Sequence, residues 1–187
     1  EGSTTFFFDQ CLGWDGLCVE PQQQYHRDIL KHRSCTLVPN CISPNQNSIT
    51  MMVDQKSTSS ARMEQIGTTT AKTATTKNQT SSLPDGYIQV ECLSFETIMQ
   101  RNKRNHVDLF VLDVEGMEAT ILDSIKWNNN NNNNNNNDDD FIVTVDAFLI
   151  EDNKAFGRRL DYDMNMRGYA KYHQLAIDSL YTRFELL

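Results

Sequence analysis

The stretch from Val107 to Glu118, which reads VDLFVLDVEGME, decides the fold of this chain. Its segment 109–114 is apolar apart from Asp113, and a short apolar run of this kind predicts a strand buried on both faces, as in a parallel sheet. Asp113 then falls at the carboxyl end of the strand, and Glu115 and Glu118 lie in the turn before a helix. Ligands of open α/β sheets bind at this end of the strands, so these acids are candidate site residues. Alternatively, Glu115 and Glu118 only begin a helix and complement its dipole.

Helices and strands alternate along the rest of the chain. Helical patterns cover residues 5–12, 22–32, 95–101, 117–127 and 154–167, with Ser94 as the expected N-cap of the third. Strand patterns cover residues 17–19, 35–38 with a continuation at 40–42, 49–53, 87–92, 141–150, 169–175 and 178–184. This alternation predicts an α/β fold with a parallel sheet, closed by a final pair of strands joined by a turn.

Two low-complexity segments interrupt the pattern. Residues 54–83 are rich in Ser and Thr without apolar periodicity, and we interpret them as a mobile insertion. Residues 128–140 consist of ten consecutive Asn followed by three Asp, which cannot bury a core and read as an expanded loop. The whole chain of 187 residues has a length that suits one domain.

Charge and hydropathy exclude some classes of partner. A formal net charge of −8 without a basic stripe argues against binding to a nucleic-acid backbone. The longest apolar runs are too short for a membrane span, and no signal-peptide pattern is visible.

The cysteines and histidines form no recognisable spacing. None of the five cysteines makes a C-x-x-C motif or a Cys/His zinc pattern. Cys18 and Cys92 lie in strand-like runs, where a free Cys behaves as a small buried hydrophobe. This favours a reducing compartment such as the cytoplasm, although the glycosylation sequon at 78–80 leaves a secreted or lumenal domain open. The four histidines have no triad-like or metal-like spacing, so we expect surface or packing roles and no metal site.

Glu20 follows the short strand at 17–19 and precedes a helix. An acid in this position is typical of the carboxylate that binds ribose in nucleotide-binding α/β folds. By itself the signal is weak, since an exposed Glu at a strand end is a common alternative.

Three segments together carry a family resemblance: LGWDGLCVEP at 12–21, VDLFVLDVEG at 107–116, and Gly168-Tyr169 before the last strands. In combination they resemble the FkbM family of S-adenosyl-L-methionine-dependent methyltransferases. The resemblance implies a Rossmann-like class I methyltransferase domain. Its sheet would be doubly wound and mainly parallel, with an antiparallel last strand and the cofactor at the carboxyl ends of the first strands.

The resemblance also implies roles for individual residues. Glu20 would hold the ribose hydroxyls of S-adenosyl-L-methionine, and Asp113 would face its sulfonium and serve catalysis together with Glu115. Glu118 and Glu151 would line the side of the acceptor. The implied reaction is O-methylation of a hydroxyl on a sugar, glycan or small metabolite.

Two departures from the family pattern leave alternatives open. The first strand and its glycine-bearing loop are expected ahead of residue 1 and are not found, and Met117 stands where the family often has His. Both favour the alternative of a non-catalytic binding module derived from the methyltransferase fold. Another nucleotide-using enzyme, such as a dehydrogenase, is a further alternative, but no G-x-G-x-x-G motif is present.

Overall fold

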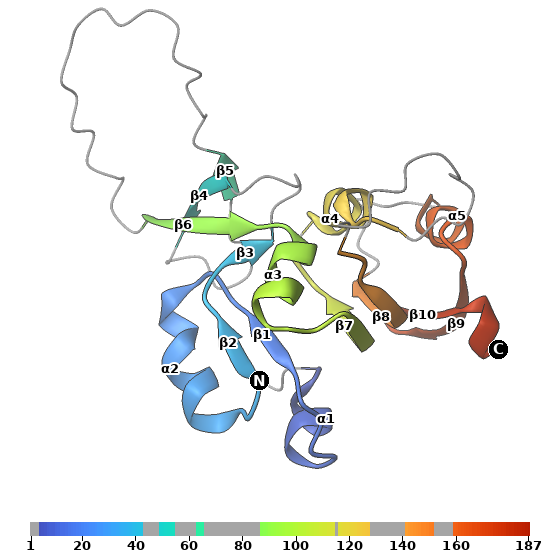
Figure 1. Cartoon of the computed structure of the whole chain (residues 1–187), viewed down its shortest axis with the longest axis horizontal. Helices are drawn as coiled ribbons and strands as arrows, with labels where there is room; N and C mark the ends of the chain where they lie inside the picture. Colours follow the sequence, from blue (N-terminus) through green and yellow to red (C-terminus); the bar gives the residue numbers. More distant parts are fainter. Residues whose placement is uncertain are drawn as a thin grey trace, which may run out of the picture. The chain divides into compact units, whose positions relative to one another are not determined.

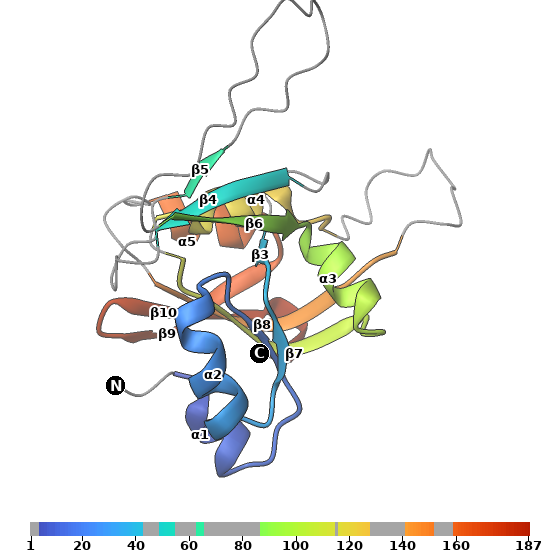
Figure 2. The same ribbon diagram turned by 90° about the vertical axis from the view of Figure 1, so that its left-hand side faces the viewer.

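The computed structural model describes residues 4–42, 49–54, 63–65, 87–114, 116–127, 141–151 and 159–187 of the chain. They belong to two compact units, Glu1–Leu93 and Ser94–Leu187, which Figures 1 and 2 show from two sides.

The first unit contains two small sheets. Its elements are α1 (Phe6–Gln10), β1 (Leu17–Val19), α2 (Gln23–His32), β2 (Thr36–Val38), β3 (Cys41–Ile42), β4 (Ile49–Asp54), β5 (Met63–Gln65) and β6 (Tyr87–Leu93). β1 and β2 pair in parallel as a two-stranded sheet. The other strands form a four-stranded sheet in the order β3-β6-β4-β5, in which β3 is parallel to β6 and β4 is antiparallel to both its neighbours.

A buried carboxylate ties α1 to the end of α2. Asp9 accepts hydrogen bonds from the Arg33 side chain and from the amide and hydroxyl of Ser34, and Arg33 also donates to Thr5 Oγ1 at 2.7 Å. Burial alone raises the pKa of Asp9, but the bonds from Ser34 and Arg33 outweigh it and lower the pKa to about 2. The charged form of Asp9 is therefore the one that this unit stabilises.

Four cysteines form two disulfides, Cys18–Cys35 and Cys41–Cys92. The first links β1 to the residue before β2, and the second links β3 to β6. The sequence-based prediction that Cys18 and Cys92 are free was therefore wrong. Cys11, which is exposed, is the free cysteine among the described residues. Because disulfides persist in oxidising surroundings, the pairing also removes the argument for a reducing compartment.

The second unit is built on one four-stranded sheet. Its elements are α3 (Phe95–Arg101), β7 (His106–Leu112), α4 (Glu118–Ser124), β8 (Thr144–Glu151), α5 (Arg159–Met166), β9 (Tyr169–Leu175), β10 (Asp178–Arg183) and the 3₁₀ turn η1 (Phe184–Leu186). The strand order is β7-β8-β10-β9. β7 and β8 are parallel, whereas β10 is antiparallel to both β8 and β9.

An aromatic cluster fills the core of this unit. Phe148 on β8 has no exposed surface and contacts Phe110, Trp127 and Tyr169, with ring centroids 5.2–5.6 Å apart. Phe110 stacks on Phe95 of α3 at 5.0 Å. The Tyr169 hydroxyl donates to the carbonyl of Val145 at 2.6 Å, and its burial raises the pKa of Tyr169 to about 12. These contacts hold α3, β7, β8 and the start of β9 together.

The sequence predicted most of these elements. The α/β class and the antiparallel last strand are confirmed, and Ser94 caps α3 by accepting a bond from Thr97 N at 3.1 Å. The predicted helix over 154–167 is described only from Arg159, and the predicted loop at 128–140 lies outside the described residues. Of the predicted insertion, only Asp54 and β5 are described.

The described strands form three sheets rather than one, with β1 and β7 each at an edge. A single doubly wound sheet within one domain over residues 1–187 therefore stays a prediction.

Reduction of the two disulfides should destabilise the first unit. Each disulfide restricts the unfolded chain, and loop closure over sequence separations of 17 and 51 residues corresponds to about 3 and about 4 kcal/mol in the chain-entropy model. We expect non-reducing peptide mapping to recover both pairs, and the melting temperature to fall by more than about 10 °C when a reductant is added. The matched control Cys11→Ser removes the free thiol and should melt like the wild type. Identical melting with and without reductant would contradict the pairing.

Candidate functional site

Glu118 organises the turn that follows β7. Its Oε1 accepts hydrogen bonds from the amides of Val114 and Gly116 at 3.0 and 3.1 Å, and the side chain has no exposed surface. Gly116 has a φ of 99°, a conformation that side-chain-bearing residues rarely adopt. A buried carboxylate is tolerated when hydrogen bonds compensate it, and here those bonds fix the turn immediately after Asp113.

Three of the acids predicted from the sequence lie together in the second unit. Asp113 follows β7, Glu151 ends β8, and Glu118 begins α4. Each offers a carboxylate oxygen, and these oxygens lie within 4.8 Å of one another. The parallel register pairs Leu112 with Ile150, so Asp113 and Glu151 each come one residue later at the same edge of the sheet. Glu115, the fourth predicted acid, lies outside the described residues.

Asp178 adds a further carboxylate that the sequence analysis missed. It is the first residue of β10 and pairs directly with Glu151 across the antiparallel ladder. Burial and then the charge of Asp113 raise the pKa of Asp178 above its ordinary range. The signal for Asp178 in the sequence is its position as the first residue of the predicted strand 178–184. We call Asp113, Glu118, Glu151 and Asp178 the acidic edge.

The acidic edge suits three kinds of chemistry. Its negative charge favours a cationic ligand, and its carboxylates accept hydrogen bonds from hydroxyls or take a proton from them. Oxygen ligands at this spacing could also hold a divalent cation such as Mg²⁺. Glu118 is the first residue of α4 and binds the backbone amides of the preceding turn. For this residue, the structure therefore supports the alternative that it only begins a helix. Its predicted contact with substrate stays a prediction.

Glu20 lies in the first unit, directly after β1. Its amide donates to the carbonyl of Val38, and its Oε1 accepts a hydrogen bond from the amide of Gln22 at 2.7 Å. His26 Nε2 lies 2.7 Å from the carbonyl oxygen of Glu20. Burial raises the pKa of Glu20, while the Gln22 bond and the charge of His26 act against that rise. The predicted strand-end position of Glu20 is confirmed, and its ligand stays a prediction.

In open α/β sheets, ligands bind outside the carboxyl ends of the strands, and Asp113 and Glu151 lie at such strand ends. The family comparison is more specific. The chain belongs to the FkbM methyltransferase family, because the family model described as the methyltransferase FkbM domain matches residues 1–169. The resemblance inferred from the sequence is thereby confirmed, and methyltransferase function is supported at the level of the family. No curated protein and no solved structure matches the chain.

Membrane insertion of a helix finds no support in the described part of the chain, where no helix is both long and apolar enough to span a bilayer.

Glu118 and Asp113 should respond differently to substitution. Glu118→Ala removes the acceptor of two backbone amides at the turn, and we expect it to lower the free energy of unfolding by about 1–3 kcal/mol. Glu118→Gln keeps an acceptor oxygen and should cost less, and Asp113→Asn should cost little because Asp113 is exposed. Chemical denaturation of the three variants measures this order. A loss in Asp113→Asn as large as in Glu118→Ala would contradict the assignment.

Proposed function

We propose that this protein transfers a methyl group from S-adenosyl-L-methionine to a hydroxyl group of a sugar or another small metabolite. The observation that carries the proposal is the acidic edge, in a chain whose family match spans residues 1–169. A cationic donor and a hydroxyl acceptor both suit a group of carboxylates at the end of a sheet.

The fold proposed with this function is the Rossmann-like class I methyltransferase domain. Parallel pairing of β1 with β2 and of β7 with β8 supports it, as does the antiparallel β10. The proposed domain extends over residues 1–187.

Glu20 is the proposed ribose-binding residue. Gln22 holds its Oε1, whereas Oε2 makes no hydrogen bond to the described residues, so this oxygen is left to accept from a ligand hydroxyl. Bonds from hydroxyls to a carboxylate are charge-assisted and therefore among the stronger hydrogen bonds. The carboxylate of Glu20 can thus accept a hydrogen bond from a ribose hydroxyl.

Asp113 is the proposed catalytic residue. When bound, S-adenosyl-L-methionine supplies a methyl group that is already activated by the positive sulfur. The protein then has to position the acceptor and remove its proton. Asp113 is exposed at the acidic edge and is proposed to orient the acceptor hydroxyl and accept its proton. Glu151 and Asp178 are proposed to line the acceptor side, and Glu118 keeps the turn in place.

One observation favours the second candidate, a non-catalytic binding module. Met117 occupies the N-cap of α4 and makes no side-chain capping bond. Met cannot transfer a proton, so it contributes nothing to acid–base chemistry at this position.

Binding of S-adenosylhomocysteine should depend on Glu20. We expect calorimetric titration to show micromolar binding to the full chain, weakened more than about tenfold in Glu20→Gln because the amide loses the charge-assisted bonds. Asp28→Asn changes an exposed acid on α2 of the same unit and should bind like the wild type. Because the family pattern has a first strand ahead of residue 1, a chain extended upstream is titrated in parallel. Absence of binding in both forms, with folding shown by circular dichroism, would favour the non-catalytic candidate.

Asp113→Asn should reduce methyl transfer far more than stability. Transfer of a deuterated methyl group to a panel of sugars and hydroxylated metabolites is followed by mass spectrometry, and we expect a loss of at least about 100-fold, as for removal of a general base. Its free energy of unfolding should stay close to that of the wild type. Equal losses of activity and stability would contradict a catalytic role.

A further inference from the structure

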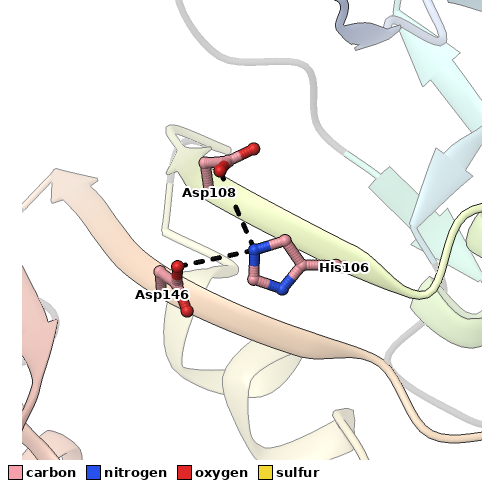
Figure 3. A group of neighbouring side chains, drawn as sticks. All are labelled: His106, Asp108 and Asp146. Carbon is pink, nitrogen blue, oxygen red and sulfur yellow. Dashed lines mark ion pairs between the residues drawn. The ribbon is translucent and has the colours of Figure 1, made fainter. Parts of the chain in front are cut away.

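A second group of side chains of the types that bind metal ions lies at the other end of β7 and β8 (Figure 3). His106 and Asp108 come from the beginning of β7, and Asp146 comes from the beginning of β8. Asp113 comes five residues of mostly extended chain after Asp108, which corresponds to roughly 17 Å. This group, the His106 cluster, is therefore distinct from the acidic edge.

The register of the two strands creates the His106 cluster. His106 pairs with Thr144, and Val107 pairs with Val145. Since side chains alternate between the two faces of a strand, His106 and Asp108 share one face with Thr144 and Asp146. No metal-like spacing is visible in the sequence, because these side chains come from two strands that are brought together only by the fold.

The distances from His106 Nε2 to the two carboxylate oxygens suit a metal ion bound between these atoms better than direct hydrogen bonds between them. His106 Nε2 lies 3.4 Å from Asp146 Oδ2 and 3.8 Å from Asp108 Oδ1. Direct N–H···O bonds measure about 2.7–3.2 Å. Zinc bonds of about 2.0–2.2 Å at tetrahedral angles would place two ligand atoms about 3.3–3.6 Å apart. Asp146 meets this spacing, and Asp108, which is 78% exposed, can rotate to meet it.

Thr144 orients the imidazole toward the two carboxylates. Its Oγ1 lies 2.8 Å from His106 Nδ1, within hydrogen-bonding distance. The tautomer that is protonated at Nδ1 donates to this hydroxyl oxygen. That tautomer leaves Nε2 with a lone pair facing two carboxylate oxygens, an arrangement that a cation between them would stabilise. Metal-bound histidines are held in this way through their other nitrogen.

We propose that His106, Asp108 and Asp146 bind a divalent transition-metal ion of the zinc type. The ion is held by one imidazole nitrogen and two carboxylate oxygens, and water completes the coordination, since the side chains are 43%, 78% and 30% exposed. Arg183 Nη1 lies 3.6 Å from the other oxygen of Asp146, Oδ1, so Oδ2 is the oxygen directed at the ion. The competing interpretation is an ion pair of protonated His106 with the two acids, which binds no metal.

Calorimetric titration with Zn²⁺ tests the proposal. The protein is the full chain without a histidine tag, in a Cys11→Ser background because the exposed thiol would compete for zinc. We expect micromolar binding of one ion, weakened more than about tenfold by His106→Gln and by Asp108→Asn, since each removes a ligand. His173→Gln, at an exposed histidine of β9, and Asp113→Asn, at the acidic edge, should bind zinc like the parent protein.

Absorption of bound Co²⁺ gives a second readout, because a nearly tetrahedral site produces intense visible bands that His106→Gln should abolish. If His106→Gln does not fold, Asp108→Asn decides, since Asp108 is largely exposed. Absence of saturable zinc binding would overturn the proposal. Unchanged binding in a folded His106→Gln, or in Asp108→Asn, or an equal loss in His173→Gln, would overturn it as well.

Discussion

The parallel pairing of β7 with β8 is the constraint on which the second unit depends. The ladder runs from His106 opposite Thr144 to Leu112 opposite Ile150. It places Phe110 beside Phe148 in the core, where Phe148 and Ile150 have no exposed surface. A slip of one residue would turn these side chains to the opposite face of the sheet, so burial of the aromatic cluster fixes the register strongly.

The same register positions the polar groups at both ends of the strands. Asp113 and Glu151 each follow the last paired residues, Leu112 and Ile150, and β10 returns antiparallel to add Asp178. Glu118 then fixes the turn after Asp113 through two backbone amides. The packed core of the sheet therefore determines where the carboxylates lie, and the turn held by Glu118 determines the orientation of Asp113. The arrangement of the acidic edge thus depends on the packing of the aromatic cluster.

Local patterns in the sequence were sufficient for elements and strand ends. The apolar run before Asp113 predicts β7, and Ser94 predicts the start of α3. The positions of Asp113, Glu118 and Glu151 at strand ends and at a helix start predict them as site residues, and the structure brings these three acids together. These inferences needed only neighbours along the chain. Asp178 and the His106 cluster were missed because each depends on a partner strand, and the register between strands cannot be read from either strand alone. The disulfides were missed for a related reason, since counting cysteines says nothing about which pairs lie close enough to bond.

In the proposed function, the acidic edge receives a cationic methyl donor. The most direct measurement is an NMR titration of the chain with S-adenosyl-L-methionine, in which the side-chain carboxyl carbons of Asp113, Glu151 and Asp178 are followed individually. We expect the Asp113 signal to shift with saturation, while the signal of the exposed Asp28 stays in place. Saturable binding that leaves all three acidic-edge signals unmoved would contradict this role of the acidic edge.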